Sequence, residues 1–184
     1  MEKMKDYDKT EAFTGEYEKI KLGGHICEIK EAKIEKSKSE RDMLVIAFDI
    51  AEGENAGYYK RKFDNMAQTT TDAKWPGVHR ILLQDLEGNC NKFFKGFITS
   101  VEASNPGYKW VWDEKTLKGK KFGAVYGREQ YRGIDGNLKF ANKIRFIRAA
   151  DKVKDAEIPE DKLLKEDTST SAWNAVIDDE NVPF

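Results

Sequence analysis

The sequence has few of the residues that form cross-links, sharp bends or catalytic pairs, with two cysteines, four prolines and two histidines in 184 residues. Cys27 and Cys90 are far apart and lack the Cys-x-x-Cys spacing of redox and metal sites, so we expect reduced, structural thiols. His25 and His79 have no cysteine or carboxylate close by in the sequence with which to form a reactive group. These absences argue against a disulfide framework and against a metal centre.

Long apolar runs and catalytic motifs are also missing. No stretch approaches the roughly 20 apolar residues of a membrane span, and residues 1–13 do not resemble a signal peptide, so we expect a cytoplasmic protein. There is no GxGxxG sequence, no glycine-rich loop ending in Lys-Ser/Thr, no HExxH and no DxDxDG loop. Asp178 and Asp179 are paired carboxylates, but nothing rigid surrounds them in a terminal segment. We therefore expect no enzyme activity and no cofactor.

Charge is unevenly distributed along the chain, although the formal net charge is only −1. Residues 25–150 carry 23 bases and 17 acids, whereas residues 151–184 carry ten acids and four bases. A basic body followed by an acidic tail is typical of proteins that bind polyanions. The division predicts a lead-in over 1–24, a domain over 25–150 and a flexible acidic tail over 151–184.

The first part of the domain has the alternating pattern of β-strands. Between residues 25 and 37 the apolar positions keep a period of two but change phase, which indicates a β-bulge and a sharply bent strand. A second strand is predicted over 43–50 and a third over 58–63. Polar turns separate these three strands.

Two helices are predicted in the middle of the chain. Residues 69–72 offer helix N-caps, apolar residues recur at helical spacing over 78–86, and Gly88 ends the run. A second short helix is predicted over 91–101, with its apolar residues on one side.

The last regular elements are predicted as a β-hairpin around the turn residues 133–137. Alternation in its second strand places Lys139, Lys143 and Arg145 on a wet face. The opposite, buried face would carry Leu138, Phe140, Ile144 and Phe146.

The element order β-β-β-α-β-β is that of a five-stranded OB-fold barrel, a mainly β fold with a helical insert between the third and fourth strands. A bent first strand fits this fold because it lets one strand serve both sides of the barrel. A five-stranded antiparallel sheet packed on helices would give the same order and is the alternative. Either fold would be followed by the disordered acidic tail.

Residues 118–148 combine dense positive charge with aromatic rings. They include nine basic and two acidic residues, with Tyr126 and Tyr131 interleaved. Single-stranded nucleic acid needs cations along its phosphates and flat rings under its unpaired bases. A solvated strand face, whose lysines discourage edge pairing, would have the same charge.

Two further groups extend the candidate DNA-binding set. In a barrel, strands two and three supply the binding face, so the predicted third strand would present Tyr58, Lys60 and Lys62 on one side. Trp110 and Trp112 would share one side of an extended loop, as core residues if buried or as stacking platforms if exposed. The full set is Tyr58, Lys60, Lys62, Trp110, Trp112, Tyr126, Arg128, Tyr131, Arg132, Lys139, Lys143 and Arg145.

The sequence closes with three acids followed by Asn181, Val182, Pro183 and Phe184. This segment closely resembles the C-terminal tip of bacterial and phage single-stranded DNA-binding proteins, which has an acidic run, a small apolar residue, Pro and a terminal Phe. Asn181 departs from the family, which usually has an apolar residue or an acid there. The long helical insert over 77–102 is more similar to a divergent phage or mobile-element member.

The resemblance implies sequence-independent binding of single-stranded DNA and recruitment of replication, recombination and repair proteins through the tip. Its phenyl ring would enter an apolar pocket of the partner, and its acids would face a basic rim. The docking residues would be Asp178, Asp179, Glu180, Val182, Pro183 and Phe184. The alternative function is a protein-interaction adaptor that binds no nucleic acid, and a small nuclease is disfavoured by the missing metal ligands. Exposed strand edges leave a homo-oligomer open.

Overall fold

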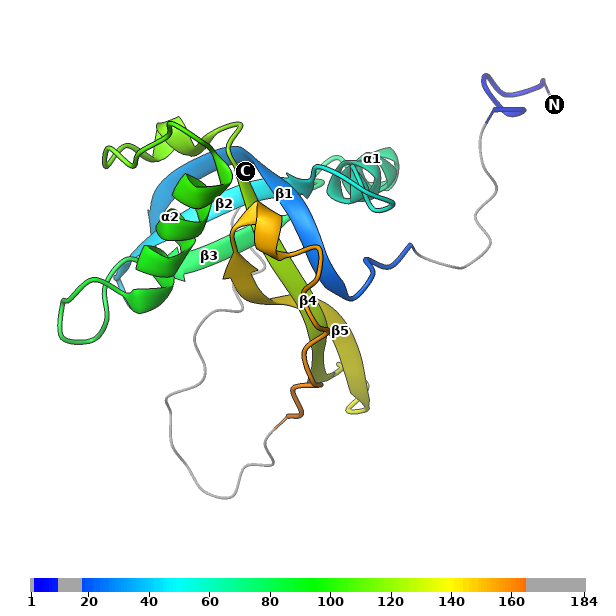
Figure 1. Cartoon of the computed structure of the whole chain (residues 1–184). Coiled ribbons are helices and arrows are strands. Elements are labelled where there is room, and N and C mark those ends of the chain that lie inside the picture. The colour runs from blue at the N-terminus through cyan, green and yellow to red at the C-terminus, as the bar shows by residue number, and fades with distance from the viewer. Residues whose placement is uncertain (1, 10–17, 165–184) are drawn as a thin grey trace.

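The structure of the protein is a computed structural model that describes residues 2–9 and 18–164. Five strands form an antiparallel sheet in the order β3-β2-β1-β4-β5, accompanied by two α-helices and two short 3-10 helices (Figure 1). The elements are β1 Gly23–Lys36, β2 Asp42–Ile50, α1 Tyr58–Thr69, β3 Val78–Leu82, α2 Lys92–Ser104, η1 Glu114–Leu117, β4 Lys121–Arg132, β5 Leu138–Arg148 and η2 Ala150–Lys152.

β1 joins the two halves of the sheet, because it pairs with β2 along one edge and with β4 along the other. Residues 23–28 pair with β4, and residues 27–36 pair with β2. The register with β2 shifts between Ile29 and Glu31, which makes Lys30 the extra residue of a bulge. The predicted bulge is therefore confirmed, and Figure 1 shows β1 as a long, curved strand.

The sheet is open, because β3 and β5 lie at its two ends and do not pair with each other in the described part of the chain. The structure confirms a mainly β fold with five antiparallel strands and helices, but it does not confirm a closed OB-fold barrel. α2 lies against one face of the sheet (Figure 1). The alternative prediction, an antiparallel sheet packed on helices, describes this arrangement.

The core lies between the sheet and α2. Phe122 of β4 meets Phe48 of β2 and Phe97 of α2 edge to face, with ring centroids 5.5 Å apart in both pairs. Burying each of these rings contributes on the order of 1.5–3 kcal/mol. Cys27 lies in the same core, where burial raises the pKa of its thiol, whereas Cys90 is exposed; both thiols are free.

α2 confirms the helix predicted over 91–101. The Asn91 side chain accepts a hydrogen bond from the backbone N–H of Phe93, with an O···N distance of 2.8 Å, and so caps the helix. Its buried face carries Phe94, Phe97, Ile98 and Val101. Phe93, which the sequence places on the same side, is 69% exposed.

In two segments the secondary structure is the reverse of the prediction: a predicted strand is a helix, and a predicted helix is a strand. Residues 58–63, predicted as the third strand, form the first half of α1, and residues 78–82, predicted as helix, form β3. β3 pairs along the edge of β2 that β1 does not occupy. The helical spacing of apolar residues over 78–86 is misleading, because pairing with that edge decides the local backbone conformation.

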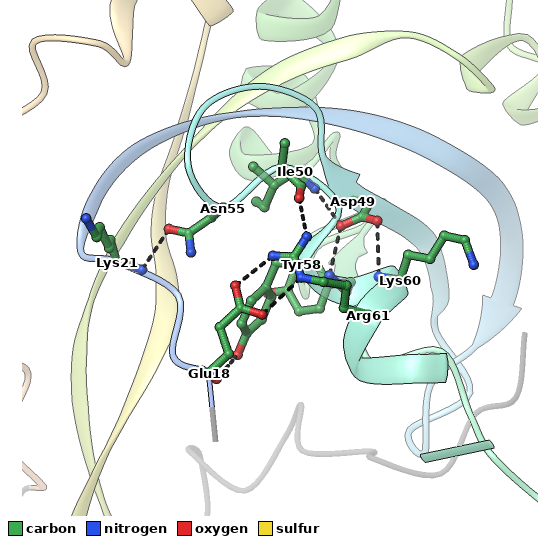
Figure 2. A network of polar contacts seen from close by, with 10 residues as sticks. Glu18, Lys21, Asp49, Ile50, Asn55, Tyr58, Lys60 and Arg61 are labelled. Atoms are coloured by element: carbon green, nitrogen blue, oxygen red, sulfur yellow. Dashed lines mark hydrogen bonds and ion pairs between the residues drawn. The ribbon is translucent and has the colours of Figure 1, made fainter. Parts of the chain in front are cut away.

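The start of α1 is capped by a residue of another element. Gly57 occupies the N-cap position with a φ of 70° and makes no side-chain capping bond. Asp49 of β2 supplies the cap: its carboxylate accepts the N–H of Tyr59 at 2.9 Å and that of Lys60 at 3.1 Å (Figure 2). A carboxylate here satisfies free N–H groups and complements the helix dipole. Residues 58–69 are therefore helical for a reason that lies outside their own sequence.

The end of the lead-in is held against this helix. Glu18 accepts two hydrogen bonds from the guanidinium of Arg61, at 2.7 and 3.1 Å, and the Lys21 N–H donates to the Asn55 side chain at 3.1 Å (Figure 2). Ile20 between them is buried in the core. The folded unit thus begins before residue 25. The charge pattern predicts that it begins at residue 25.

Removing the cap on α1 should lower the stability of the fold. Asp49 is 4% exposed and accepts three backbone N–H groups, including that of Ile50. We expect Asp49→Ala to lower the free energy of unfolding by roughly 2–3 kcal/mol, because buried donors lose their acceptor. Urea denaturation measures this change. Asp64→Ala, at an exposed carboxylate of α1, is the control and should cost less than about 1 kcal/mol; equal losses would contradict the capping role.

His79 should make stability depend on pH. It lies on β3 opposite the core residue Ile46, and burial lowers its pKa to about 4, with the charge of Arg80 acting in the same direction. Between about pH 6.5 and 4 the unfolded chain binds a proton at this residue that the folded chain excludes, so stability falls as the pH falls through that window. The slope from this one group is at most about 1.4 kcal/mol per pH unit.

Urea denaturation at pH 5 and pH 7 tests this expectation. His79→Gln should reduce the difference between the two pH values. An unchanged difference in His79→Gln would assign the pH dependence to other groups.

Candidate functional site

β4 and β5 form a hairpin that extends beyond the rest of the sheet. β1 pairs with β4 only as far as Tyr126, whereas the pairing between β4 and β5 continues to Arg132 and Leu138. Figure 1 shows this outer part projecting from the sheet. Both of its faces can therefore carry exposed side chains.

One face of the hairpin brings bases and aromatic rings together. Residues paired across an antiparallel ladder share a face, as do alternate residues along a strand. The register of β4 with β5 thereby gathers five exposed side chains on the face that includes Gly127. We call them the basic hairpin face, and they are Tyr131, Lys139, Lys143, Phe146 and Arg148.

Phe146 belongs to this face because β5 contains a bulge. The pairing register shifts at Arg145, which is the extra residue, so Ile144 and Phe146 point to opposite sides. Ile144 packs against the core, whereas Phe146 is 49% exposed. The prediction that Phe146 shares a buried face with Leu138, Phe140 and Ile144 is therefore wrong.

On the opposite face of the hairpin, the two arginines Arg128 and Arg132 form hydrogen bonds to other residues of the protein. Arg128 donates two hydrogen bonds to the Asp161 carboxylate, at 2.8 and 2.5 Å, and these bonds raise the pKa of Arg128. Its guanidinium carbon also lies 5.1 Å from the centroid of the Phe140 ring. Arg132 donates to the backbone carbonyl of Gly136 at 2.9 Å.

On the basic hairpin face, Lys139 forms an ion pair with Asp135 at 2.9 Å. Both side chains are about half exposed, so this pair contributes little to stability and a phosphate could replace Asp135. Arg145, at the bulge, donates to the backbone carbonyl oxygens of Arg128 and Glu160 at 3.4 and 3.3 Å. It thereby links the hairpin to the segment that follows η2.

That segment crosses the base of the hairpin. Val153 is fully buried, and a Cβ atom on Gly24 would lie 1.7 Å from the carbonyl oxygen of Val153. A Cβ atom on Gly127 would lie 3.2 Å from Pro159. We call residues 153–164 the C-terminal strap. It packs as part of the folded unit, although the charge pattern assigns it to the acidic tail.

The end of the strap pairs with the part of β4 that β1 leaves free. The Lys162 N–H donates to the Arg128 carbonyl at 2.9 Å, and the Lys162 carbonyl accepts from Gln130 at 2.8 Å, which forms a parallel bridge. Lys162 also pairs with the Glu129 carboxylate at 2.6 Å. The ion pair is partly exposed and weak, so these backbone hydrogen bonds and the buried Val153 fix the strap.

A groove separates the strap from β5. Its volume is about 490 Å³, and its β-sheet side consists of Val125, Phe146 and Arg148. Lys152 and strap residues from Asp155 to Glu160 form the other side. Two residues of the basic hairpin face, Phe146 and Arg148, therefore lie both on an open strand face and in a concave site.

Tyr58 and Tyr126, predicted as stacking residues, are buried. The Tyr58 hydroxyl donates to the Glu18 carbonyl at 3.2 Å, and the Tyr126 hydroxyl shares a hydrogen bond of 2.8 Å with that of Tyr59. Burial raises the pKa of both predicted residues. The expectation that their rings are exposed to a ligand is wrong, because the core encloses them.

The remaining predicted residues divide between three places. Lys60 and Lys62 are exposed on α1 rather than on a strand, and Lys60 pairs with Asp64 at 2.8 Å. Trp110 is half-buried against α2, and Trp112 is 79% exposed in the loop before η1. Figure 1 shows α1 and that loop apart from the projecting hairpin. Of the predicted set, the hairpin carries Arg128, Tyr131, Arg132, Lys139, Lys143 and Arg145, and only Tyr131, Lys139 and Lys143 share the basic hairpin face.

Sequence reasoning missed Phe146 and Arg148 as site residues. Strict alternation places Phe146 on the apolar face, and Arg145 fits that alternation. The bulge that reverses Phe146 leaves only a weak signal, the two adjacent apolar residues Phe146 and Ile147. The predicted docking residues, within 178–184, lie outside the described residues.

No protein-family model matches the chain, and no curated protein sequence is significantly similar to it. Over residues 2–9 and 18–164, no helix is long and apolar enough to cross a membrane. The same residues contain no group of three His, Cys, Asp or Glu side chains that could hold a metal ion. The interpretation of the site therefore depends on its own geometry.

Close contact between Gly24 and the strap gives a stability prediction. Gly24→Ala places a methyl group where the Val153 carbonyl lies, so we expect a loss of roughly 1–3 kcal/mol in the free energy of unfolding and faster proteolysis of the strap. Gly96→Ala is the matched control, because a Cβ there meets no atom within 4 Å. That variant should gain up to about 1 kcal/mol from helix propensity. A stable Gly24→Ala protein would contradict the close packing of the strap.

Proposed function

We propose that the protein binds single-stranded DNA without sequence preference, and that the basic hairpin face is the binding surface. The observation that carries this proposal is the register of β4 with β5, which puts Tyr131, Lys139, Lys143, Phe146 and Arg148 on one exposed face. Cations neutralise the phosphates, and the two rings stack on unpaired bases. Both features are common to every DNA sequence, so this chemistry discriminates little between bases.

The spacing of the face supports an extended, unpaired strand as the ligand. Alternate residues of a β-strand are about 6.6–6.8 Å apart, so Lys139 and Lys143 present their charges along a line of roughly 13 Å. Tyr131 lies opposite Lys139, and Phe146 lies between Lys143 and Arg148. Rings beside such charges can contact bases only if the bases are unstacked and free to turn toward the protein. A duplex keeps its bases paired, and this favours the single strand.

The topology is compatible with an OB-type fold as part of the proposal. A bent first strand shared by β2 and β4, with a helix between β3 and β4, is the arrangement of an OB barrel. In this proposal the sheet is an open variant of that barrel, and the projecting hairpin enlarges its binding surface. The adaptor alternative would use the same basic face for an acidic protein.

Recruitment of replication, recombination and repair proteins is the second part of the proposal. It rests on the sequence of the tip, residues 178–184, and its resemblance to single-stranded DNA-binding proteins. Deleting Pro183 and Phe184 should remove partner binding and leave DNA affinity intact.

A salt titration tests DNA binding. Fluorescence anisotropy with a labelled dT oligonucleotide should give a log–log slope of about −0.7 for each phosphate contacted, hence about −2 for a surface with three cations. Lys139→Gln combined with Lys143→Gln should weaken binding and make the slope shallower by about 1.4. Lys60→Gln combined with Lys62→Gln is the control on α1 and should change neither quantity. No binding, a flat slope, or equal effects of the two double variants would contradict the proposal.

A further inference from the structure

The groove between the strap and β5 has room for one planar, neutral group. Its volume of about 490 Å³ falls within the range of roughly 300–1,000 Å³ that is usual for small-ligand sites. Phe146 provides the exposed apolar surface of its floor, next to the buried Val125 of the paired strand. The floor is formed by residues of two paired strands, so it is rigid.

Phe146 is available for stacking. The ring is 49% exposed even with the strap in place. The guanidinium carbon of Arg148 lies 6.0 Å from the ring centroid, which is the outer limit of a cation–π contact. A loosely held cation of this kind can move aside while the ring accepts a flat group.

The two walls of the groove differ in charge. Arg148 and Lys152 are cationic, whereas the strap contributes Asp155, Glu157 and Glu160. The acids repel a phosphate from the interior of the groove, but they do not repel a neutral ring. A ligand that carries a neutral ring and an attached anion can place the ring inside and the anion beside the two cations.

The strap gives the groove its depth. It passes over Gly24, where a Cβ atom would lie 1.7 Å from the Val153 carbonyl oxygen, and close to Gly127, where a Cβ atom would lie 3.2 Å from Pro159. Arg145 donates to the Glu160 carbonyl at 3.3 Å. Without the strap, Phe146 would lie on an open strand face. The concave shape thus depends on residues beyond the last strand.

We propose that this groove receives one nucleobase of the bound DNA, stacked on Phe146, with its phosphate beside Arg148 and Lys152. The inference rests on the proposed function, since it assigns one nucleotide subsite within the same DNA-binding surface. The remaining nucleotides lie along Lys143, Lys139 and Tyr131 toward the tip of the hairpin. The strap is therefore a wall of the binding site.

The experiment compares affinity and salt slope for the full chain with a labelled 12-nucleotide dT oligonucleotide. Stacking on one ring predicts that Phe146→Ala weakens binding roughly 5- to 100-fold. Its salt slope should stay as in the wild type, because a neutral ring releases no counterions. Phe146→Tyr keeps a flat ring and should retain affinity. Phe93→Ala removes a ring from α2 that is more exposed than Phe146, 69% against 49%, and should have no effect.

A charge variant and a folding measurement complete the test. Arg148→Gln should make the slope shallower by about 0.7, in contrast to Phe146→Ala. Thermal unfolding of Phe146→Ala establishes whether that variant is folded at the assay temperature. If the variant is unfolded, Phe146→Tyr still tests whether a flat ring at this position supports binding. Unchanged affinity in Phe146→Ala, or a loss shared by Phe146→Tyr, would overturn the base subsite. The proposed function would survive that result if the Lys139 and Lys143 variants still lose affinity, and it fails if the wild type does not bind.

Discussion

The bend in β1 is the constraint on which the architecture depends. A straight strand of this length would pair with its neighbours over their whole lengths, but the bulge at Lys30 turns β1 so that its two ends serve different partners. Pairing with β4 ends at Tyr126 because β1 begins at its partner, Gly23, so the outer part of β4 pairs with β5 on one edge and meets the strap at Lys162 on the other. The projecting hairpin, and with it the candidate DNA-binding face, lies beyond the point at which β1 begins.

At the base of the hairpin, glycines without side chains allow two segments to pack closely. Gly24 and Gly123 let the C-terminal strap lie directly on the sheet, because a Cβ atom at either position would come within 2.3 Å of Val153. The strap then pairs with the edge of β4 that β1 leaves free, and its acids face the bases of β5 across a groove. Residues 153–164, which the charge pattern assigns to an acidic tail, therefore pack against the sheet and line that groove.

Local sequence was a good guide where an element is stabilised by its own residues. The alternation of β2 and of the final hairpin, the phase change in β1 and the Asn91 cap of α2 all correspond to observed elements. Prediction from local sequence failed where contacts with another part of the chain determine the secondary structure. Asp49 caps α1 from β2, and the free edge of β2 draws residues 78–82 into a strand. Tyr58 and Tyr126 became core residues for the same reason, since α1 and β4 meet there.

The sequence by itself determined the β-rich class, the bent first strand and the concentration of positive charge over 118–148, because each depends on residues adjacent in the chain. Only the tertiary structure decided which of those charges share a face. A single bulge at Arg145 reverses Phe146, and a glycine-lined contact brings the strap beside it. Both effects depend on hydrogen bonds between segments distant in sequence, and the order of residues alone does not specify such pairing.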